Sequence, residues 1–420
     1  MSRRVIGALA VLVVAGLATG LAGVALGGGK AKNAGTILFG ISAAKTGALA
    51  PYDLQPGQAF QLRIGEINKA GGVLGKQIKV KWIDTKSDKP TAATNAQELI
   101  SEGAVVILGT CDFDYSFPAI NAAGSKGILG MSLCASSPKV ATPAIVGPYG
   151  GSMGEGSDTE GTGMAEWLRK THPKWKRAYV VKDTSLEYSK ATADYFAAAW
   201  KALGGTISGE DTFVGGTTTL DLSSQITRLR GKVKQTDIIY DGSWLPYGAT
   251  FIRQVRSAGI GLPIAVNNSI DGTLLTQVAG KISNVYGMGS VCIPSYCSGG
   301  VTPQVAKFYA SFKKKYGVAL SNSYPTRGYD LATAIVGAIN KAHSTKGSEI
   351  AKALFSGAVI KTMSGPVKFT SKCHRPQPPS HIFEQWTRGK AKSLGRVYTK
   401  TIPNIGDGNP CAGKQAAPLK

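Results

Sequence analysis

The sequence predicts an α/β protein with two similar lobes, each a parallel sheet flanked by helices. Short apolar strands alternate with longer amphipathic helices, the alternation occurs twice along the chain, and the length exceeds what one core accommodates. The chain has 420 residues, of which 43% are hydrophobic and 17% charged. This is the composition of a globular protein, and its length favours two domains.

The first half contains four expected strands joined by helices. Residues 77–84 alternate polar and apolar side chains, which is typical of a strand, whereas Phe60, Ile64 and Ile67 share one face of an expected helix. The expected strands are 36–41, 77–84, 105–108 and 128–133, and the expected helices are 58–68, 91–102 and 117–125. Strands that alternate with helices form parallel sheets through right-handed crossovers.

A second series follows the Gly- and Pro-rich residues 143–163, which we interpret as a flexible connection. The expected strands are 177–182, 206–208, 237–240 and 263–266, and the expected helices are 161–171, 189–203, 222–232, 248–258, 302–316, 324–343 and 348–356. Because the last helices should return to the first lobe, we expect that lobe to comprise 35–150 plus 288–364. The second lobe should comprise 151–287 plus 365–420.

The N-terminal residues 1–34 resemble a secretory signal. Arg3 and Arg4 precede an apolar run from Val5 to Leu26, which is the layout of a signal peptide. The run is also long enough to span a bilayer if it is not cleaved, so an N-terminal anchor is the alternative. No cysteine precedes Cys111, which excludes a lipid-anchored cysteine at this end.

The six cysteines agree with export, because an even number in a chain with a signal indicates disulfides. Fifteen pairings are possible, but the spacing favours Cys111–Cys134, Cys292–Cys297 and Cys373–Cys411. The first pair would follow two adjacent parallel strands and so lie at one sheet edge. The spacing and the few histidines do not fit a metal site.

The chain carries a formal charge of +23, little of which comes from residues 1–34. Such a charge favours anionic surfaces. The sequence lacks the motifs of nucleic-acid-binding folds, so we expect a solvated basic surface and no nucleic-acid partner.

Several segments carry a recognisable pattern: Thr46–Tyr52, Ile67–Lys76, Trp82–Pro90, Gly127–Pro138 and Asp237–Trp244. They resemble the branched-chain amino acid (Leu/Ile/Val)-binding proteins of ABC transporters, a type 1 periplasmic-binding family. The most specific is Ile67–Lys76, with its Ile-Asn-x-x-Gly-Gly-x-x-Gly pattern, and the similarity extends from Thr36 to about Arg388. The resemblance implies two Rossmann-like lobes joined by three hinge crossings, with a ligand between them.

Carried over position by position, the resemblance implies a set of ligand-binding residues that come from both lobes. They are Tyr52, Asp112, Phe113, Asp114, Cys134, Ser136, Tyr188, Trp244, Asn268, Asp271 and Tyr324.

Two departures from the family pattern bear on the ligand. Asn268 occupies the position where amino acid binders have an acid for the ligand ammonium, and Asp112 and Asp114 stand where a ligand carboxylate needs neutral donors. An unpaired acid repels a buried carboxylate. We therefore expect a neutral polar, amide or amine ligand and not an ordinary aliphatic amino acid. The alternative is that Asp112 and Asp114 only cap a helix.

Catalytic chemistry is the weaker hypothesis. Gly150–Gly154 matches the Gly-x-Ser-x-Gly motif of esterases around Ser152, but the surrounding Pro and Gly do not fit the strand–turn–helix that this motif needs. We find no phosphate-binding or cofactor motif and expect no cofactor.

The expected function is that of an extracytoplasmic, monomeric binding protein that delivers a small polar solute, an amino acid, amide or amine-like molecule, to an ABC transporter permease. It would reach the membrane surface through the permease or an uncleaved N-terminus. A sensory receptor domain of the same fold, or a serine hydrolase, is the alternative.

Overall fold

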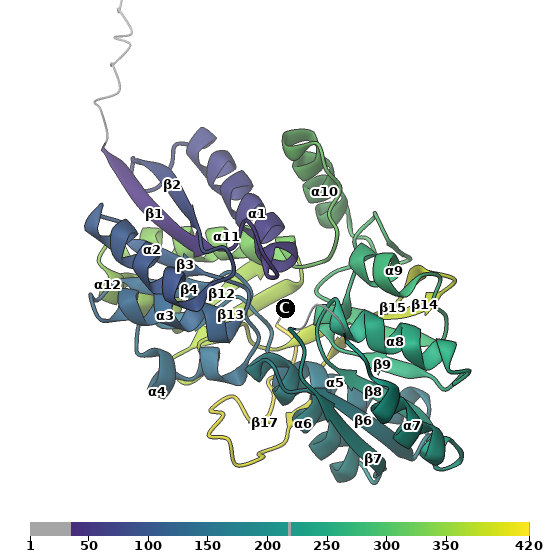
Figure 1. Ribbon diagram of the computed structural model, residues 1–420. Coiled ribbons are helices and arrows are strands. Elements are labelled where there is room, and N and C mark those ends of the chain that lie inside the picture. The colour runs from purple at the N-terminus through teal and green to yellow at the C-terminus, as the bar shows by residue number, and fades with distance from the viewer. Residues whose placement is uncertain (1–34, 217–219, 420) are drawn as a thin grey trace, which may run out of the picture. The chain divides into compact units, whose positions relative to one another are not determined.

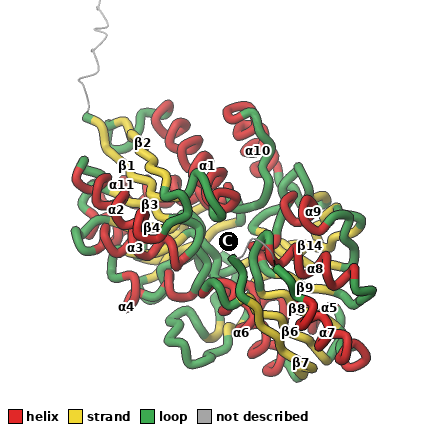
Figure 2. The backbone as a smooth tube through the Cα atoms, in the orientation of Figure 1, coloured by secondary structure: helices red, strands yellow, loops and turns green. Residues whose placement is uncertain are grey.

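The computed structural model describes residues 35–216 and 220–419. The predicted signal or anchor in residues 1–34 lies outside this range. Across the described residues, no helix combines the length and apolar character needed to cross a membrane. The predicted α/β class is confirmed, since two separate sheets are each flanked by helices (Figures 1 and 2).

The first sheet has the strand order β2-β1-β3-β4-β5, and all of its pairings are parallel. Its strands are β1 (Thr36–Ala43), β2 (Gln77–Asp84), β3 (Val106–Gly109), β4 (Leu129–Ser132) and β5 (Gly150–Ser152). The helices after these strands are α1 (Ala50–Lys69), α2 (Lys89–Ser101), α3 (Phe113–Gly124) and α4 (Pro143–Val146).

Helices cover both faces of this sheet because its strands are apolar on both sides. Val106 and Leu108 pack with the cluster that holds α1, α11 (Pro325–Ala342) and α12 (Gly347–Leu354). Ile107, which points the other way, packs with apolar residues of α2 and α3.

The glycine pair that follows α1 is required by the turn. Gly72 has a φ of +79°, and a side-chain carbon there would lie 2.0 Å from the Lys76 carbonyl oxygen.

The second sheet has the order β11-β15-β14-β10-β9-β8-β6-β7. The strands β6 (Arg177–Asp183), β7 (Thr206–Phe213), β8 (Ile238–Gly242), β9 (Ile264–Val266) and β10 (Val285–Gly289) run parallel. Next come the antiparallel β14 (Ser380–Thr387) and β15 (Lys390–Tyr398), and then β11 (Cys297–Ser298). The flanking helices are α5 (Ser157–Thr171), α6 (Glu187–Ala202), α7 (Ser223–Lys232), α8 (Tyr247–Ser257) and α9 (Thr273–Ala279).

The remaining elements are α10 (Pro303–Tyr316), which contacts α1, and two small sheets. These sheets pair β12 (Ser356–Thr362) with β13 (Gly365–Thr370), and β16 (Thr401–Ile402) with β17 (Gly413–Lys414).

The structure differs from the sequence-based expectations at several elements, of which three matter most for the site. Residues 143–163 are not a flexible connection, because they form α4, β5 and the start of α5. Helix α1 begins at Ala50, eight residues before the expected start, with Pro51 in its first turn, where proline is tolerated. The strands β10 and β12–β15 were not predicted.

The segments that exchange between the sheets also differ from the expected lobe limits. Strand β5 keeps Gly151 and Ser152 in the first sheet, and β10 keeps residues up to Gly289 in the second. Val367 and Phe369 of β13 pack into the apolar cluster of the first sheet. The crossings therefore follow β5, β10 and β13.

Buried ionic side chains tie these three crossings together, and Arg327 reaches the second crossing by donating from Nε to Ser290 Oγ, directly after β10, at 2.9 Å. Glu155, from the first crossing, pairs with Arg327 at the start of α11, and its other oxygen lies 3.0 Å from His381 Nδ1. Asp158 at the start of α5 pairs with Arg375 from the third crossing, with an Nη2–Oδ2 distance of 2.7 Å. We call these five ionic residues, each at most 3% exposed, the crossing cluster.

The pKa of Glu155 reflects this pairing. Burial alone would raise it, but the influence of the Arg327 guanidinium and of the neighbouring His381 outweighs burial and lowers the pKa to about 2. The carboxylate is therefore ionised at neutral pH, and the cluster is charged on both sides.

Candidate ligand-binding cleft

A small cleft lies at the carboxyl ends of the strands of both sheets, which is where open α/β sheets bind ligands. Its walls come from the loops after β1, β3, β4, β6, β8 and β9 and from the start of α11. The lining residues are Leu49, Tyr52, Cys111, Asp112, Cys134, Ser136, Leu186, Tyr188, Trp244, Ser269 and Tyr324. The cavity that remains between them has a volume of about 30 Å³, so side chains nearly fill the cleft in this conformation.

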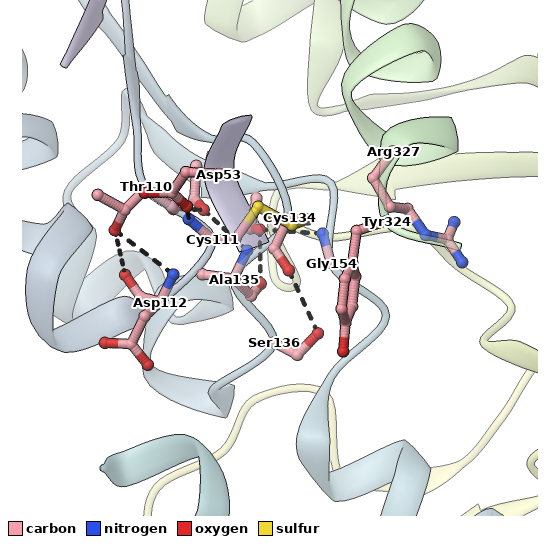
Figure 3. Close-up of a disulfide and its surroundings, with 12 residues drawn as sticks. Asp53, Thr110, Cys111, Asp112, Cys134, Ala135, Ser136, Gly154, Tyr324 and Arg327 are labelled. Atoms are coloured by element: carbon pink, nitrogen blue, oxygen red, sulfur yellow. Dashed lines mark hydrogen bonds between the residues drawn. A yellow bond between two sulfur atoms is a disulfide. The ribbon is translucent and has the colours of Figure 1, made fainter. Parts of the chain in front are cut away.

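The Cys111–Cys134 disulfide forms part of the wall on the side of the first sheet (Figure 3). It forms because β3 and β4 pair in parallel with Gly109 opposite Ser132, so the residues that follow the two strands meet at one edge. Its formation confirms the predicted pairing, as do the disulfides Cys292–Cys297 and Cys373–Cys411.

Asp53 holds the turn that carries Cys111. Its carboxylate accepts hydrogen bonds from Cys111 N at 2.7 Å and from Ala44 N at 2.8 Å, which joins the loops after β1 and β3. Burial raises the pKa of Asp53 to about 7, although both hydrogen bonds act in the opposite direction.

Tyr52 reaches across the cleft from the first turn of α1. Its hydroxyl accepts a hydrogen bond from Leu245 N at 2.8 Å, and the carbonyl oxygens of Leu245 and Ser269 lie 3.1 and 3.3 Å away as acceptors. Its ring centroid lies 6.1 Å from that of Trp244 and 5.8 Å from that of Tyr324. Tyr52 therefore joins the two lobes through the centre of the cleft.

Two further contacts close the rim. Asp114 accepts a hydrogen bond from Glu187 N at 3.0 Å, and Lys139 Nζ lies 2.9 Å from Glu187 Oε2. These contacts also join first-sheet loops to the start of α6, so the structure shows the closed arrangement of the two lobes.

Glu160 lies behind the wall on the second-sheet side. Tyr188 donates its hydroxyl proton to Glu160 Oε2 at 2.5 Å, and the same oxygen accepts from Asn268 N at 3.1 Å. Ser269 N in turn donates to the Tyr188 hydroxyl at 3.1 Å. Burial raises the pKa of Glu160 to about 7 against the influence of His381 and these hydrogen bonds. This network fixes the Tyr188 ring in the wall.

Asp112 is the one acid among the described lining residues, and none of them is Lys, Arg or His. It is the N-cap of α3, since Oδ1 accepts from Tyr115 N at 3.3 Å. Burial, followed by the nearby charge of Asp114, raises its pKa to about 8. Asp112 was predicted either to face the ligand or only to cap a helix. In the structure it caps α3 and also lines the cleft.

The structure brings seven of the eleven predicted ligand-binding residues to the cleft: Tyr52, Asp112, Cys134, Ser136, Tyr188, Trp244 and Tyr324. The other four lie elsewhere in this conformation. Phe113 packs against Phe117, because the first residue of α3 turns its side chain toward the helix's own apolar cluster.

Asp114, Asn268 and Asp271 also lie outside the wall. Asp114 binds the rim at Glu187 N, and Asn268 contributes its backbone N–H to Glu160. Asp271 accepts from Tyr296 OH and Ser323 N, both at 2.9 Å, which places it behind the cleft.

Sequence reasoning missed Leu49, Leu186 and Ser269 in the wall and Glu160 behind it. Leu49 and Leu186 directly precede α1 and α6, so correct helix starts would have found them. Glu160 has no such signal, because its helix was expected to begin only at Gly161.

Ser152 does not have the geometry of an esterase nucleophile. It is fully buried at the end of β5, donates to Ala135 O at 2.6 Å and accepts from Gly154 N at 2.9 Å. In the described structure no histidine hydrogen-bonds to its hydroxyl.

Comparison with known proteins gives consistent results. A family model described as "Periplasmic binding protein" matches residues 36–391. The Leu/Ile/Val-binding protein homolog 3 of Brucella melitensis is 24% identical over 359 residues, which cover 85% of this chain and 93% of that protein.

Solved structures share the fold at low identity. The isoleucine complex of the branched-chain amino acid transporter substrate-binding protein LivJ from Streptococcus pneumoniae is 22% identical. It has a TM-score of 0.73, with 87% of this chain and 99% of that chain covered. An ABC transporter solute-binding protein from Rhodopseudomonas palustris, in complex with 3,4-dihydroxybenzoic acid, is 18% identical. Its TM-score is 0.72, with 88% and 99% covered.

The family match spans most of the chain, and the two-sheet fold with its shared cleft agrees with it. The chain belongs to the periplasmic binding protein family.

Proposed function

We propose that this protein is the extracytoplasmic solute-binding component of an ABC transporter, which captures a small polar molecule between its two lobes and delivers it to a permease. The observation that carries the proposal is the cleft itself, whose walls come from the strand ends of both sheets. A ligand there contacts both lobes only when they are closed, so its binding energy drives closure.

The comparisons support transport binding and leave the ligand open. The Brucella relative is named for leucine, isoleucine and valine, whereas the two solved structures contain isoleucine and a dihydroxybenzoic acid. The fold thus accommodates different small solutes, and the side chains of this cleft decide which of them this protein binds.

We propose further that the protein acts as a monomer outside the cytoplasm and performs no catalysis. The three disulfides support an oxidising compartment. The buried, hydrogen-bonded Ser152 supports the absence of hydrolysis. A panel of activated esters should show no turnover that Ser152→Ala abolishes.

A thermal-shift screen with amino acids, amides, amines, aromatic acids and sugars tests the proposed function. A ligand that binds only the folded protein raises the melting temperature. At least one class should do so and should also change the tryptophan fluorescence, because Trp244 lies in the wall.

The variant Trp244→Ala should weaken the binding of any hit, because it removes part of the wall. Trp175→Ala is the matched control, since Trp175 stacks on His172 away from the cleft. If no class of solute shifts the melting temperature, solute capture is wrong. If Trp244→Ala binds as the unchanged protein does, the ligand binds elsewhere.

A further inference from the structure

The ionisable carboxyl groups near the cleft are not balanced by bases in its wall. Asp112 lies in the wall, and Asp53 and Glu160 lie directly behind it. Asp183 and Asp241, at the ends of the neighbouring strands β6 and β8, are both fully buried. Of these five carboxyl groups, Asp112 lines the cleft, and the described lining contains no basic side chain.

Three of these acids are incompletely paired, because Glu160 Oε1 and one oxygen of each of the two strand-end acids are buried without a hydrogen-bond partner in the described structure. Asp183 uses Oδ1 to accept from Ser185 N and Gly215 N, both at 2.9 Å, and Asp241 uses Oδ1 to accept from Ser243 OH at 2.6 Å. Within the described structure, Oδ2 of each is buried without a hydrogen-bond partner. A buried acid without a positive partner is costly. These acids do not line the cleft themselves, but the charge of a cation bound there would offset part of the cost of burying acids nearby.

The basic residues of the interior do not supply that positive charge. Arg327, Arg375 and His381 are bound to Glu155 and Asp158 in the crossing cluster. In Figure 3 the Arg327 guanidinium points away from Asp112 and the disulfide. These bases are therefore paired with acids of their own. His381 also acts on Glu160, whereas no base is among the groups that shift the pKa of Asp112.

The rest of the wall is aromatic. Tyr52, Tyr188, Trp244 and Tyr324 all line the cavity, and Tyr52 lies between Trp244 and Tyr324. Aromatic faces attract cations, and such walls are used to recognise ammonium groups. The same aromatic faces provide no positive group for a carboxylate.

We propose that the cleft selects an organic cation, a solute with an ammonium group and no carboxylate, with Asp112 as the residue that determines charge specificity. This inference rests on the proposed function and narrows its ligand class. The ammonium group would lie between Asp112 and the aromatic wall. Because the closed cavity is only about 30 Å³, the ligand enters an opened cleft and displaces the Tyr52 hydroxyl from its contacts across it.

Three probes with the same branched carbon chain separate the charges. Leucine carries both groups, 3-methylbutylamine lacks the carboxylate, and 4-methylpentanoate lacks the ammonium. Choline and its uncharged analogue 3,3-dimethyl-1-butanol form a second matched pair. In titration calorimetry we expect 3-methylbutylamine to bind more tightly than leucine, 4-methylpentanoate not to bind, and choline to bind more tightly than its analogue.

The variant Asp112→Asn tests the assigned residue. Asparagine caps helices about as well as aspartate, so α3 keeps its start while the charge is lost. The substitution weakens the charged hydrogen bond between the ligand ammonium and the side chain at position 112. The affinity for the amine should therefore fall about tenfold to a hundredfold. Asp88→Asn is the control, because Asp88 is the N-cap of α2 and lies outside the cleft. It should leave all affinities unchanged.

The outcomes separate the two proposals. Tighter binding of leucine or 4-methylpentanoate than of 3-methylbutylamine overturns the cation proposal and leaves solute capture standing. Unchanged amine affinity in Asp112→Asn overturns the role of Asp112 and with it the proposal. If neither these probes nor the wider solute panel binds, the proposed function fails as well.

Discussion

The crossing cluster and the cleft are two buried polar regions of one interior, and they treat charge in opposite ways. In the crossing cluster, Glu155 and Asp158 each have a positive partner within the protein. Around the cleft, Asp112 and Glu160 bind only N–H and O–H groups and have raised pKa values. The acids of the crossing cluster are thus paired with basic side chains of the protein. The acids around the cleft have no such partner, and a bound ligand could provide one.

The largest expected effect comes from breaking the crossing cluster. Arg327→Met removes the guanidinium that pairs with the buried Glu155, and removal of one partner of a buried pair costs about 3–5 kcal/mol of unfolding free energy. Urea unfolding followed by circular dichroism measures it. Arg177→Met, which breaks the exposed pair with Asp237, should change little. A loss in Arg327→Met as small as in this control would show that the cluster is not holding the crossings.

The second effect concerns the disulfide in the cleft wall. Replacing both Cys111 and Cys134 by serine should lower the unfolding free energy by about 2–4 kcal/mol, because the cross-link restricts the unfolded chain. The same replacement at Cys292 and Cys297 should cost less, since those residues are 5 apart in sequence and not 23. The first pair should also weaken ligand binding, and the second should not. Equal effects on binding would argue against a role for the disulfide in the cleft.

A smaller effect is expected from Tyr52→Phe, which keeps the ring and removes the hydroxyl that joins the lobes. Leu245 N then loses its acceptor, and the closed form should lose about 1–2 kcal/mol relative to the open one. Small-angle scattering of the ligand-free protein should show a larger radius of gyration. Tyr316→Phe is the control, because its hydroxyl bonds to Gln58 O within the first lobe. A radius unchanged in Tyr52→Phe would mean that the hydroxyl does not hold the lobes closed.

The last effect, which changes gradually with conditions, is a pH dependence of the ligand-free protein. Because the pKa of Asp112 is raised to about 8, the native state binds more protons than the unfolded state between about pH 4 and pH 8. Stability should therefore fall as pH rises through this window, by at most about 1.4 kcal/mol per pH unit for this group. Urea unfolding at pH 6, 7 and 8 should show a shallower fall in Asp112→Asn. Parallel curves for the two proteins would contradict the raised pKa.

The sequence was most informative where a pattern was regular. The alternation of 77–84 predicted β2 with the bounds that the structure shows, and the two apolar runs ending at Cys111 and Cys134 predicted their disulfide. Glycine and proline were misleading. Gly150–Ser152 form a strand because parallel pairing with β4 satisfies their backbone, and Pro51 begins a helix instead of preventing one.

The candidate site was partly predictable because its residues follow strands, and strand ends converge at one edge. What the pattern could not give was the direction of each side chain. Asp112 and Phe113 are adjacent, yet one faces the cleft and the other packs behind α3. Glu160 was missed because its role depends on Tyr188 and Asn268, which only the folded chain brings near it.

The three crossings between the lobes, joined by the crossing cluster, restrict how the lobes can move. A single linker allows two lobes to rotate and translate in several directions. Three crossings that are bound to one another leave rotation about a common axis as the motion of lowest energy cost. Residues near that axis, such as Glu155 and Arg375, then move little, whereas those at the rim, such as Asp114 and Glu187, move most. We therefore expect opening and closing of the cleft to follow this one rotation. Its energetic cost would depend on the crossing cluster, which the ligand does not contact.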